Sequence, residues 1–408
     1  MFNKINEFYD YIMIFVVIYF SSSFVGISMN GTISISIIVI TSLIYLLINY
    51  RKIKFSMHKV IIFTLILFLS LLTHLINSDN TYNYSIFWIA LSCAFLISLA
   101  IDIDRFINVF INIIFFIAVF SLITYSLIFI SPSLFSFIPV YTNSSGIEAY
   151  NSIFSVVRIS TYFNSNYGLF WEPGAYQTFL NLALYFLLFY KTNKKGFKIF
   201  IIILSILTTV STSGYIALVL QVLIYFFVKK KNKENKKITI LIIFLFFIGI
   251  ISVLNMPEVV LFKLFGKLTA LFDQSLLTHS SYESTLARTN SIEAPLEGII
   301  ENPLLGVGFE KLSFIAREMG SMYLTATPLN WFGLFGILFG TIFTWLTWRW
   351  TIIVSHYIPI RIFACTFLFI IMFSENYNRN AFILLLLLMS LKNLERSEKY
   401  GNLTYKQL

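Results

Sequence analysis

The segment FWEPG, residues 170–174, places a carboxylate between an indole and a proline, in a chain with only 19 acidic residues among 408. Proline is favoured in the first turn of a helix, so Pro173 predicts a helix start with Glu172 near its N-cap. A carboxylate there stabilises the helix N-terminus. Partial desolvation by Trp171 and Phe170 would raise its basicity and suit it to act as a general base for a hydroxyl group. Helix capping, pairing with Arg158 and base catalysis are all open for Glu172.

Two arginines lie in polar segments on either side of this motif. Arg158 is the only cation between residues 132 and 173. Arg288 is at the start of a helix predicted by the apolar spacing of ARTNSIEAPLEGIIE, residues 287–301, and Asn302-Pro303 ends this helix. A guanidinium binds phosphate in bidentate fashion and stays charged, so both arginines are candidate phosphate ligands. The simpler interpretations are a solvated loop arginine and a helix that packs on its neighbours.

Composition identifies the class of protein that must position these groups. Hydrophobic residues make up 58% of the chain, charged residues 12%, and the mean hydropathy is +0.82. Soluble domains carry about 25% charged residues, so we expect an integral membrane protein. Cys93 and Cys365 fall inside apolar runs, which argues against a disulfide framework. We find no nucleotide-binding motif and no Cys/His spacing typical of a metal site.

A helix needs about 20 apolar residues to cross a bilayer. The chain offers twelve apolar runs that we interpret as spans, some of them shorter than this, near 9–29, 32–50, 60–77, 84–101, 106–131, 174–190, 198–211, 214–228, 238–255, 328–348, 361–374 and 380–392. We therefore expect an all-α, polytopic fold with about twelve transmembrane helices in a single transmembrane domain, residues 1–408.

Three short basic loops set the expected orientation. They are RKIKFSMHK (51–59), KTNKKGFK (191–198) and KKKNKENKK (229–237), and the positive-inside rule places all three in the cytoplasm. A tight hairpin that turns at residues 211–214 is then required between the last two. Both termini become cytoplasmic, and the long segments 132–173 and 256–327 become periplasmic loops. The net charge of +10 follows from this topology, so it gives no reason to expect a nucleic acid partner.

Five segments together carry a resemblance to a known family. They are FWEPGAYQTFLNLAL (170–184), STSGYIAL (211–218), ARTNSIEAPLEGIIENPLLGVGF (287–309), TPLNWFGLFGILFG (327–340) and FSEN (373–376). In this order, the chain resembles the bacterial O-antigen polymerase (Wzy) family and its relative, the O-antigen ligase family. The resemblance implies a GT-C-type membrane glycosyltransferase in the bacterial inner membrane, with its active site facing the periplasm. Its substrate would be an oligosaccharide repeat unit on undecaprenyl pyrophosphate.

The resemblance also implies roles for particular residues. Arg158 and Arg288 would grip the lipid pyrophosphate and share one cavity with Glu172, which would take the proton of the attacking hydroxyl. No metal or other cofactor is implied, and a Wzz-like chain-length regulator is a possible partner. The candidate substrate-binding residues are Arg158, Arg288, Tyr167, Trp171, Asn330, Gly306 and Gly308.

Two alternatives stay open beside a polymerase. Ligases carry an arginine in the segment that matches STSGY and a histidine before the asparagine that matches Asn330, and this chain has neither. A lipid-linked oligosaccharide flippase would need charged or polar groups deep in its spans and often has repeated halves. Here the ionisable residues cluster in the outer loops and the cytoplasmic connectors. The residues therefore favour a polymerase.

Overall fold

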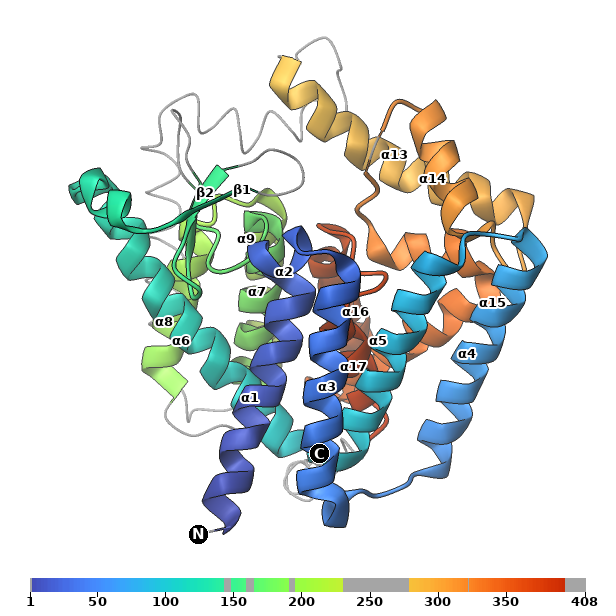
Figure 1. Cartoon of the computed structure of the whole chain (residues 1–408), viewed down its shortest axis with the longest axis horizontal. Helices are drawn as coiled ribbons and strands as arrows, with labels where there is room; N and C mark the ends of the chain where they lie inside the picture. The colour runs from blue at the N-terminus through green and yellow to red at the C-terminus, as the bar shows by residue number, and fades with distance from the viewer. Residues whose placement is uncertain are drawn as a thin grey trace.

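The computed structural model describes residues 2–142, 148–158, 165–190, 195–229, 279–321 and 323–392. Long helices dominate these residues and stand side by side in Figure 1. The first six are α1 (Phe2–Ser22), α2 (Phe24–Ser28), α3 (Gly31–Asn49), α4 (Met57–Asn77), α5 (Thr81–Ala100) and α6 (Ile103–Ile130). Ser23 separates α1 from α2, because its side chain accepts a hydrogen bond from the backbone N–H of Gly26 and caps a new helix.

The second half of the chain continues the bundle. Its helices are α7 (Pro173–Phe189), α8 (Lys195–Thr208), α9 (Thr212–Lys229), α13 (His279–Glu301), α14 (Gly308–Glu318), α15 (Thr327–Trp350), α16 (Ile358–Phe373) and α17 (Ala381–Met389). Short 3-10 turns cover Tyr50–Lys52, Pro132–Phe137 and Thr351–Ile353. Every predicted span except one contains a helix, and the exception, 238–255, lies outside the described residues.

Five of the described helical stretches are long and apolar enough to cross a membrane by length and composition. They are Gly31–Lys52, Met57–Asn77, Thr81–Ala100, Ile103–Ile130 and Thr327–Ile353, and shorter apolar helices accompany them. The chain is thus a mostly helical, multi-pass membrane protein. The count of twelve spans and the GT-C class stay predictions.

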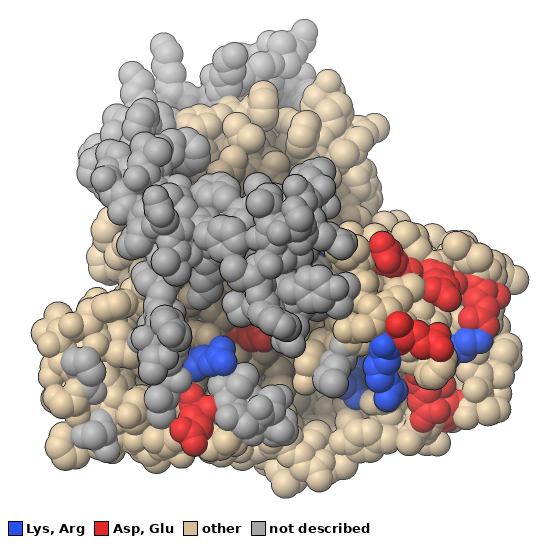
Figure 2. Space-filling view, turned by 90° about the horizontal axis from the view of Figure 1, so that it is seen from above, with Lys and Arg blue, Asp and Glu red and all other residues tan. Residues whose placement is uncertain are grey.

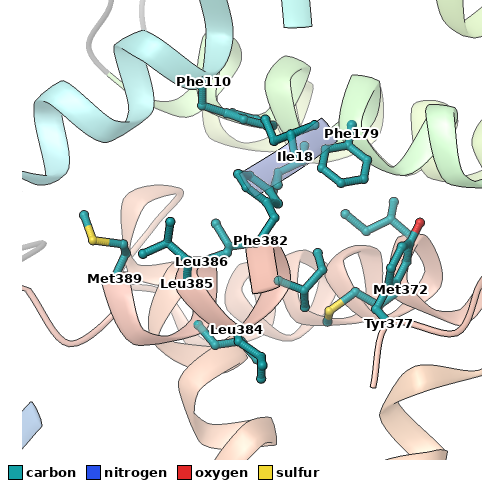
Figure 3. Close-up of a cluster of buried hydrophobic side chains, with 14 of the residues drawn as sticks. Ile18, Phe110, Phe179, Met372, Tyr377, Phe382, Leu384, Leu385, Leu386 and Met389 are labelled. Atoms are coloured by element: carbon teal, nitrogen blue, oxygen red, sulfur yellow. The ribbon is translucent and has the colours of Figure 1, made fainter. Parts of the chain in front are cut away.

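Helix α17 lies at the centre of the bundle. All nine of its residues are buried, as expected for a helix that is apolar on every side. Phe382 packs with ring centroids 5.0 Å from Phe110 of α6 and 5.1 Å from Phe179 of α7 (Figure 3). This core fixes the turn before α17 against the start of α7, which matters for the site below.

A small antiparallel sheet departs from the all-α prediction. Its strands are β1 (Val140–Thr142), β2 (Glu148–Asn151) and β3 (Val156–Arg158), in the order β1-β2-β3. Val140 pairs with Tyr150, and Ala149 pairs with Arg158. The strands lie within the segment 132–173, so this predicted loop has regular structure and presents Arg158 from a strand end.

The polar segments gather at one end of the molecule. In Figure 1, α13, α14 and the sheet lie at the top, whereas α1 begins at the bottom. The turn between α8 and α9 also reaches the top, because the backbone N–H of Asn166 donates to the carbonyl of Thr208 over 3.0 Å. Two helices joined by a tight turn are therefore present as predicted, but the turn is at residues 209–211, because residues 212–214 already belong to α9. Which side of a membrane each end faces stays a prediction.

Candidate active site

Glu172 is the residue before α7, as the sequence predicts, but its surroundings differ from expectation. Pro173 occupies the first helical position, and the Glu172 side chain makes no capping hydrogen bond. Glu172 is exposed, whereas Phe170 is fully buried and packs on Tyr176 and Phe179 at centroid distances of 5.4 and 4.6 Å. The expected desolvation of Glu172 by Phe170 is therefore wrong. Neither a capping hydrogen bond nor burial of the side chain explains why a glutamate occupies position 172.

The buried carboxylate of the site is Glu375, in the turn between α16 and α17. Glu375 is only 6% exposed, and its Oε2 accepts a hydrogen bond from Trp171 Nε1 over 3.0 Å. The turn is clamped to the start of α15, because Thr327 Oγ1 donates to the Glu375 carbonyl over 2.6 Å and accepts from Tyr377 N over 2.7 Å. Sequence reasoning noted FSEN but assigned Glu375 no role. An acidic residue directly after an apolar span was the available signal.

Gly174 explains how this carboxylate fits against α7. A Cβ atom at position 174 would lie 2.3 Å from Glu375 Oε1. A larger residue at position 174 would therefore require the carboxylate to move away from the first turn of α7. The EPG motif and the FSEN motif, about 200 residues apart, form one structural unit: Trp171 donates to Glu375, Pro173 begins the helix, and Gly174 admits the carboxylate.

Arg288, on α13, completes the cluster. Its guanidinium is half-buried, and burial lowers its pKa while the negative charges of Glu375 and Glu172 raise it. The pKa of Glu375 lies well above its usual range, first because of burial and then because of the neighbouring Glu172 charge. The Trp171 hydrogen bond and the Arg288 charge oppose that rise without cancelling it. Two carboxyl groups and one guanidinium thus interact at the end of the bundle that holds α13.

Helix α13 holds Arg288 in place through close packing on α15. A Cβ atom on Gly333 of α15 would come within 2.8 Å of Pro295 Cα, so the two backbones approach closely. Asn290 Nδ2, one turn or less from Arg288, donates to the Met319 carbonyl over 2.7 Å. Pro295, the proline inside α13, is the residue that contacts Gly333. The helix continues to Glu301, where the sequence predicts its end.

The surface around Arg288 is acidic. Seen from above, Asp and Glu side chains gather along the edge that holds α13 and α14 (Figure 2). The exposed acidic residues of these two helices are Glu293, Glu297, Glu301, Glu310 and Glu318, and they outnumber the exposed basic residues Lys311 and Arg317. Such a surface does not attract anions at long range. A diphosphate would have to be bound by a local cation, and Arg288 is the cation next to the carboxyl pair.

The two glycines of the GVG segment make close contacts within the protein. Gly306 (φ +70°) approaches the Leu334 backbone, where a Cβ atom would meet the carbonyl at 2.4 Å. Gly308 (φ +78°) lies against Asp79, whose Oδ2 accepts from Phe309 N over 2.6 Å at the start of α14. These contacts fasten α14 to the junction of α4 and α5. Direct substrate binding by Gly306 and Gly308 stays a prediction.

Asn330 and Tyr167 lie in well-packed surroundings. Asn330 is fully buried on α15; its Nδ2 donates to the Thr325 carbonyl, and its Oδ1 has no partner among the described residues. Tyr167 packs on the small cluster of Phe24, Ala149 and Val156 beside the sheet. Their predicted roles in substrate binding stay predictions.

Arg158 is exposed at the end of β3 and lines a small cavity with Tyr125, Ser165 and Asn166. Within the described ranges, no hydrogen bond or ion pair joins Arg158 to Glu172, Glu375 or Arg288. The structure thus connects Arg288 with the carboxyl pair, and a cavity shared by both arginines stays a prediction.

A chain of buried amides runs inward from the site. Asn181 Nδ2 donates to Gln177 Oε1 over 2.9 Å, and Gln221 Nε2 donates to Asn181 Oδ1 over 2.9 Å. Gln177 Nε2 also donates to Ser374 Oγ over 3.1 Å, directly before Glu375. These groups are neutral and bond to one another, so they join α7, α9 and α16 at the base of the site.

Fold and site together define a class: a multi-pass helical membrane protein with an arginine and two carboxyl groups at one end of its bundle. Residues 197–322 match the family model described as O-antigen ligase. This range is less than a third of the chain and includes most of α8, all of α9, α13 and α14, and Arg288. The match confirms the predicted resemblance over these residues, which are similar to the O-antigen ligase family. No curated protein and no solved structure matches the chain.

Proposed function

We propose that this protein is an O-antigen or polysaccharide polymerase. It joins oligosaccharide repeat units linked to undecaprenyl pyrophosphate, at the periplasmic face of the bacterial inner membrane. The observation that carries the proposal is the group formed by Arg288, Glu172 and Glu375 at the outer end of an apolar helical bundle. It combines a phosphate ligand with carboxyl groups next to the membrane, where a lipid-linked sugar diphosphate would lie.

The chemistry is a glycosyl transfer. The Arg288 guanidinium binds the diphosphate of the donor chain in bidentate fashion. A hydroxyl of the acceptor repeat unit attacks the donor's anomeric carbon, and the Glu172 carboxylate takes the hydroxyl proton. The new glycosidic bond forms as the carbon–oxygen bond to the diphosphate breaks. The lipid diphosphate leaves as an anion, so the step needs no acid. Arg158 contributes a second phosphate contact from the end of β3.

The exposure of Glu172 suits this role. A base must reach the proton of an incoming hydroxyl, and an exposed carboxylate above the start of α7 can do so. Glu375 is buried beneath it and less accessible. We therefore assign proton transfer to Glu172, as the sequence predicts, although its environment differs from the one expected.

The family model covers ligases as well as polymerases, so the choice between them rests on individual residues. The STSGY segment has no arginine, and residues 325–329 before Asn330 contain no histidine. Both departures favour the polymerase. A flippase is the third candidate, but the deep polar residues of α7 and α9 are neutral amides bonded to one another. A Wzz-like regulator that sets chain length would be the natural partner of a polymerase.

The test is the lipopolysaccharide ladder of cells that lack the gene. We expect loss of long chains with one repeat unit still attached to the lipid core, and restoration of the ladder by the wild-type gene. Glu172→Gln should restore about 10²- to 10⁴-fold less polymerisation, whereas the exposed Glu318→Gln should restore it fully. Loss of every repeat unit on deletion would instead indicate a ligase or a flippase.

A further inference from the structure

Glu375 is held too firmly, and buried too deeply, to be an incidental neighbour of Glu172. Its carboxyl group accepts from the Trp171 indole over 3.0 Å, and its backbone carbonyl accepts from Thr327 over 2.6 Å. The second carboxyl oxygen, Oε1, lies against Gly174 of α7, where an added Cβ atom would come within 2.3 Å of it. The carboxyl group is also within hydrogen-bonding reach of Glu172. The start of α7 thus holds the side chain of Glu375, and the start of α15 holds its backbone.

The net charge of the site limits the protonation states in which Glu172 and Glu375 can take part in the reaction. With both carboxyl groups ionised, the group of Glu172, Glu375 and Arg288 would have a net charge of −1, and it would repel an anionic diphosphate. With one proton on the pair, the net charge is zero and Arg288 is free to bind phosphate. Two adjacent carboxyl groups, of which one is buried, share a proton for this reason.

We propose that Glu375 is a positioning residue that keeps this proton and donates it, as an O–H···O hydrogen bond, to the ionised Glu172. Its carbonyl oxygen accepts from Trp171 and its hydroxyl points to Glu172. Glu172 is then held ionised and oriented toward the acceptor hydroxyl. This inference rests on the proposed function, because it assigns Glu375 a role in the same glycosyl transfer.

The electrostatics of the site agree with this assignment. Burial and the Glu172 charge raise the pKa of Glu375 well above its usual range. The groups that face it are Glu172 and Trp171 from the start of α7, Arg288 from α13 and Tyr377 from its own turn. Since the pKa of Glu375 is raised, its proton is present at lower pH and is lost as the pH rises. Polymerisation should therefore decline on the alkaline side, when Glu375 ionises.

Glutamine variants separate the two roles. Glu375→Gln keeps the carbonyl that accepts from Trp171 and replaces the O–H with an N–H that still donates to Glu172. It stays neutral at every pH. We expect purified Glu375→Gln to polymerise a synthetic lipid-diphosphate-linked repeat unit within about threefold of the wild-type rate and to lose the alkaline decline. Glu375→Leu, which cannot donate, should lose about 10- to 100-fold in rate. Glu172→Gln should be inactive, with protein amount and unfolding temperature unchanged.

A second variant keeps the test decisive if Glu375→Gln folds poorly. Trp171→Phe keeps an aromatic ring but removes the N–H that favours the ionised form of Glu375, so the alkaline decline should move to higher pH. A folded Glu375→Gln enzyme that is inactive, or that retains the alkaline decline, would overturn the proposal, as would an active Glu172→Gln enzyme. Failure of the wild-type protein to polymerise would contradict the proposed function instead.

Discussion

Gly174→Ala is the substitution for which the structure makes the least intuitive prediction. In most helices, alanine in place of glycine stabilises by about 0.5–1 kcal/mol, because it restricts the unfolded chain and favours helical backbone. At position 174 the added Cβ would lie 2.3 Å from Glu375 Oε1, whereas ordinary contacts begin at 3.4 Å. The carboxyl group must therefore move by roughly 1 Å.

That movement breaks the 3.0 Å hydrogen bond from Trp171 to Glu375. A buried polar group that loses its partner costs about 1–3 kcal/mol, so the helix gain is offset and the net destabilisation is about 0–2 kcal/mol. The effect on activity is larger, since a displacement of about 1 Å at a catalytic group can cost about 100-fold in rate. We expect a folded protein that polymerises at least about tenfold more slowly.

Gly196→Ala is the matched control. Gly196 is the second residue of α8, as Gly174 is of α7, and a Cβ atom there would have no neighbour within 4 Å. The assay compares unfolding temperature in detergent and polymerisation rate for the two variants. Gly196→Ala should be as stable as the wild type or more so, and fully active. A Gly174→Ala protein that is also as stable and as active as the wild type would show that Glu375 does not need its position beside α7.

Two further predictions concern the arginines and the topology. Arg288→Lys and Arg158→Lys should each lower polymerisation by about tenfold or more, because an ammonium cannot reproduce the bidentate contact with phosphate; full polymer from both variants at normal protein level would mark them as ordinary surface residues. A cysteine in place of the exposed Ile153 should react in whole cells with a reagent that does not cross membranes, whereas one in place of the exposed Phe55 should not; the reverse pattern would invert the proposed topology.

Apolar runs and proline positions made most of the helices predictable. A run of about 20 apolar residues has few structural options in a membrane, and helices occur in every predicted span that the structure describes. Pro173 begins α7, and α13 ends at Glu301, directly before Asn302-Pro303. The residues next to each helix end are sufficient to predict these boundaries. The sheet was missed because strands of three or four residues give too little alternation to recognise.

The site could be predicted only in part. Glu172 and Arg288 were found because rare charged residues in an apolar chain are conspicuous, and the structure connects them electrostatically. Glu375 was not recognised, because its importance depends on the turn before α17 meeting the start of α7. That contact is set by the packing of Phe382 on Phe110 and Phe179, which no local pattern encodes.

The glycines show the same limit. The sequence indicated that GVG allows close backbone approach, and the positive φ angles of Gly306 and Gly308 agree with that. The sequence did not indicate which residues approach these two glycines. The partners are the Leu334 backbone and the Asp79 carboxylate, both distant in sequence.

The most direct test of the central claim is a reaction with the purified protein in liposomes. The substrate is a single synthetic repeat unit on undecaprenyl pyrophosphate, and the products are measured by gel electrophoresis and mass spectrometry. A polymerase should yield oligosaccharides of two, three and more repeat units and release one undecaprenyl pyrophosphate for each bond formed, and Glu172→Gln should yield almost none. Transfer of the repeat unit to a lipid A–core acceptor without any lengthening of the chain would contradict the account and identify a ligase.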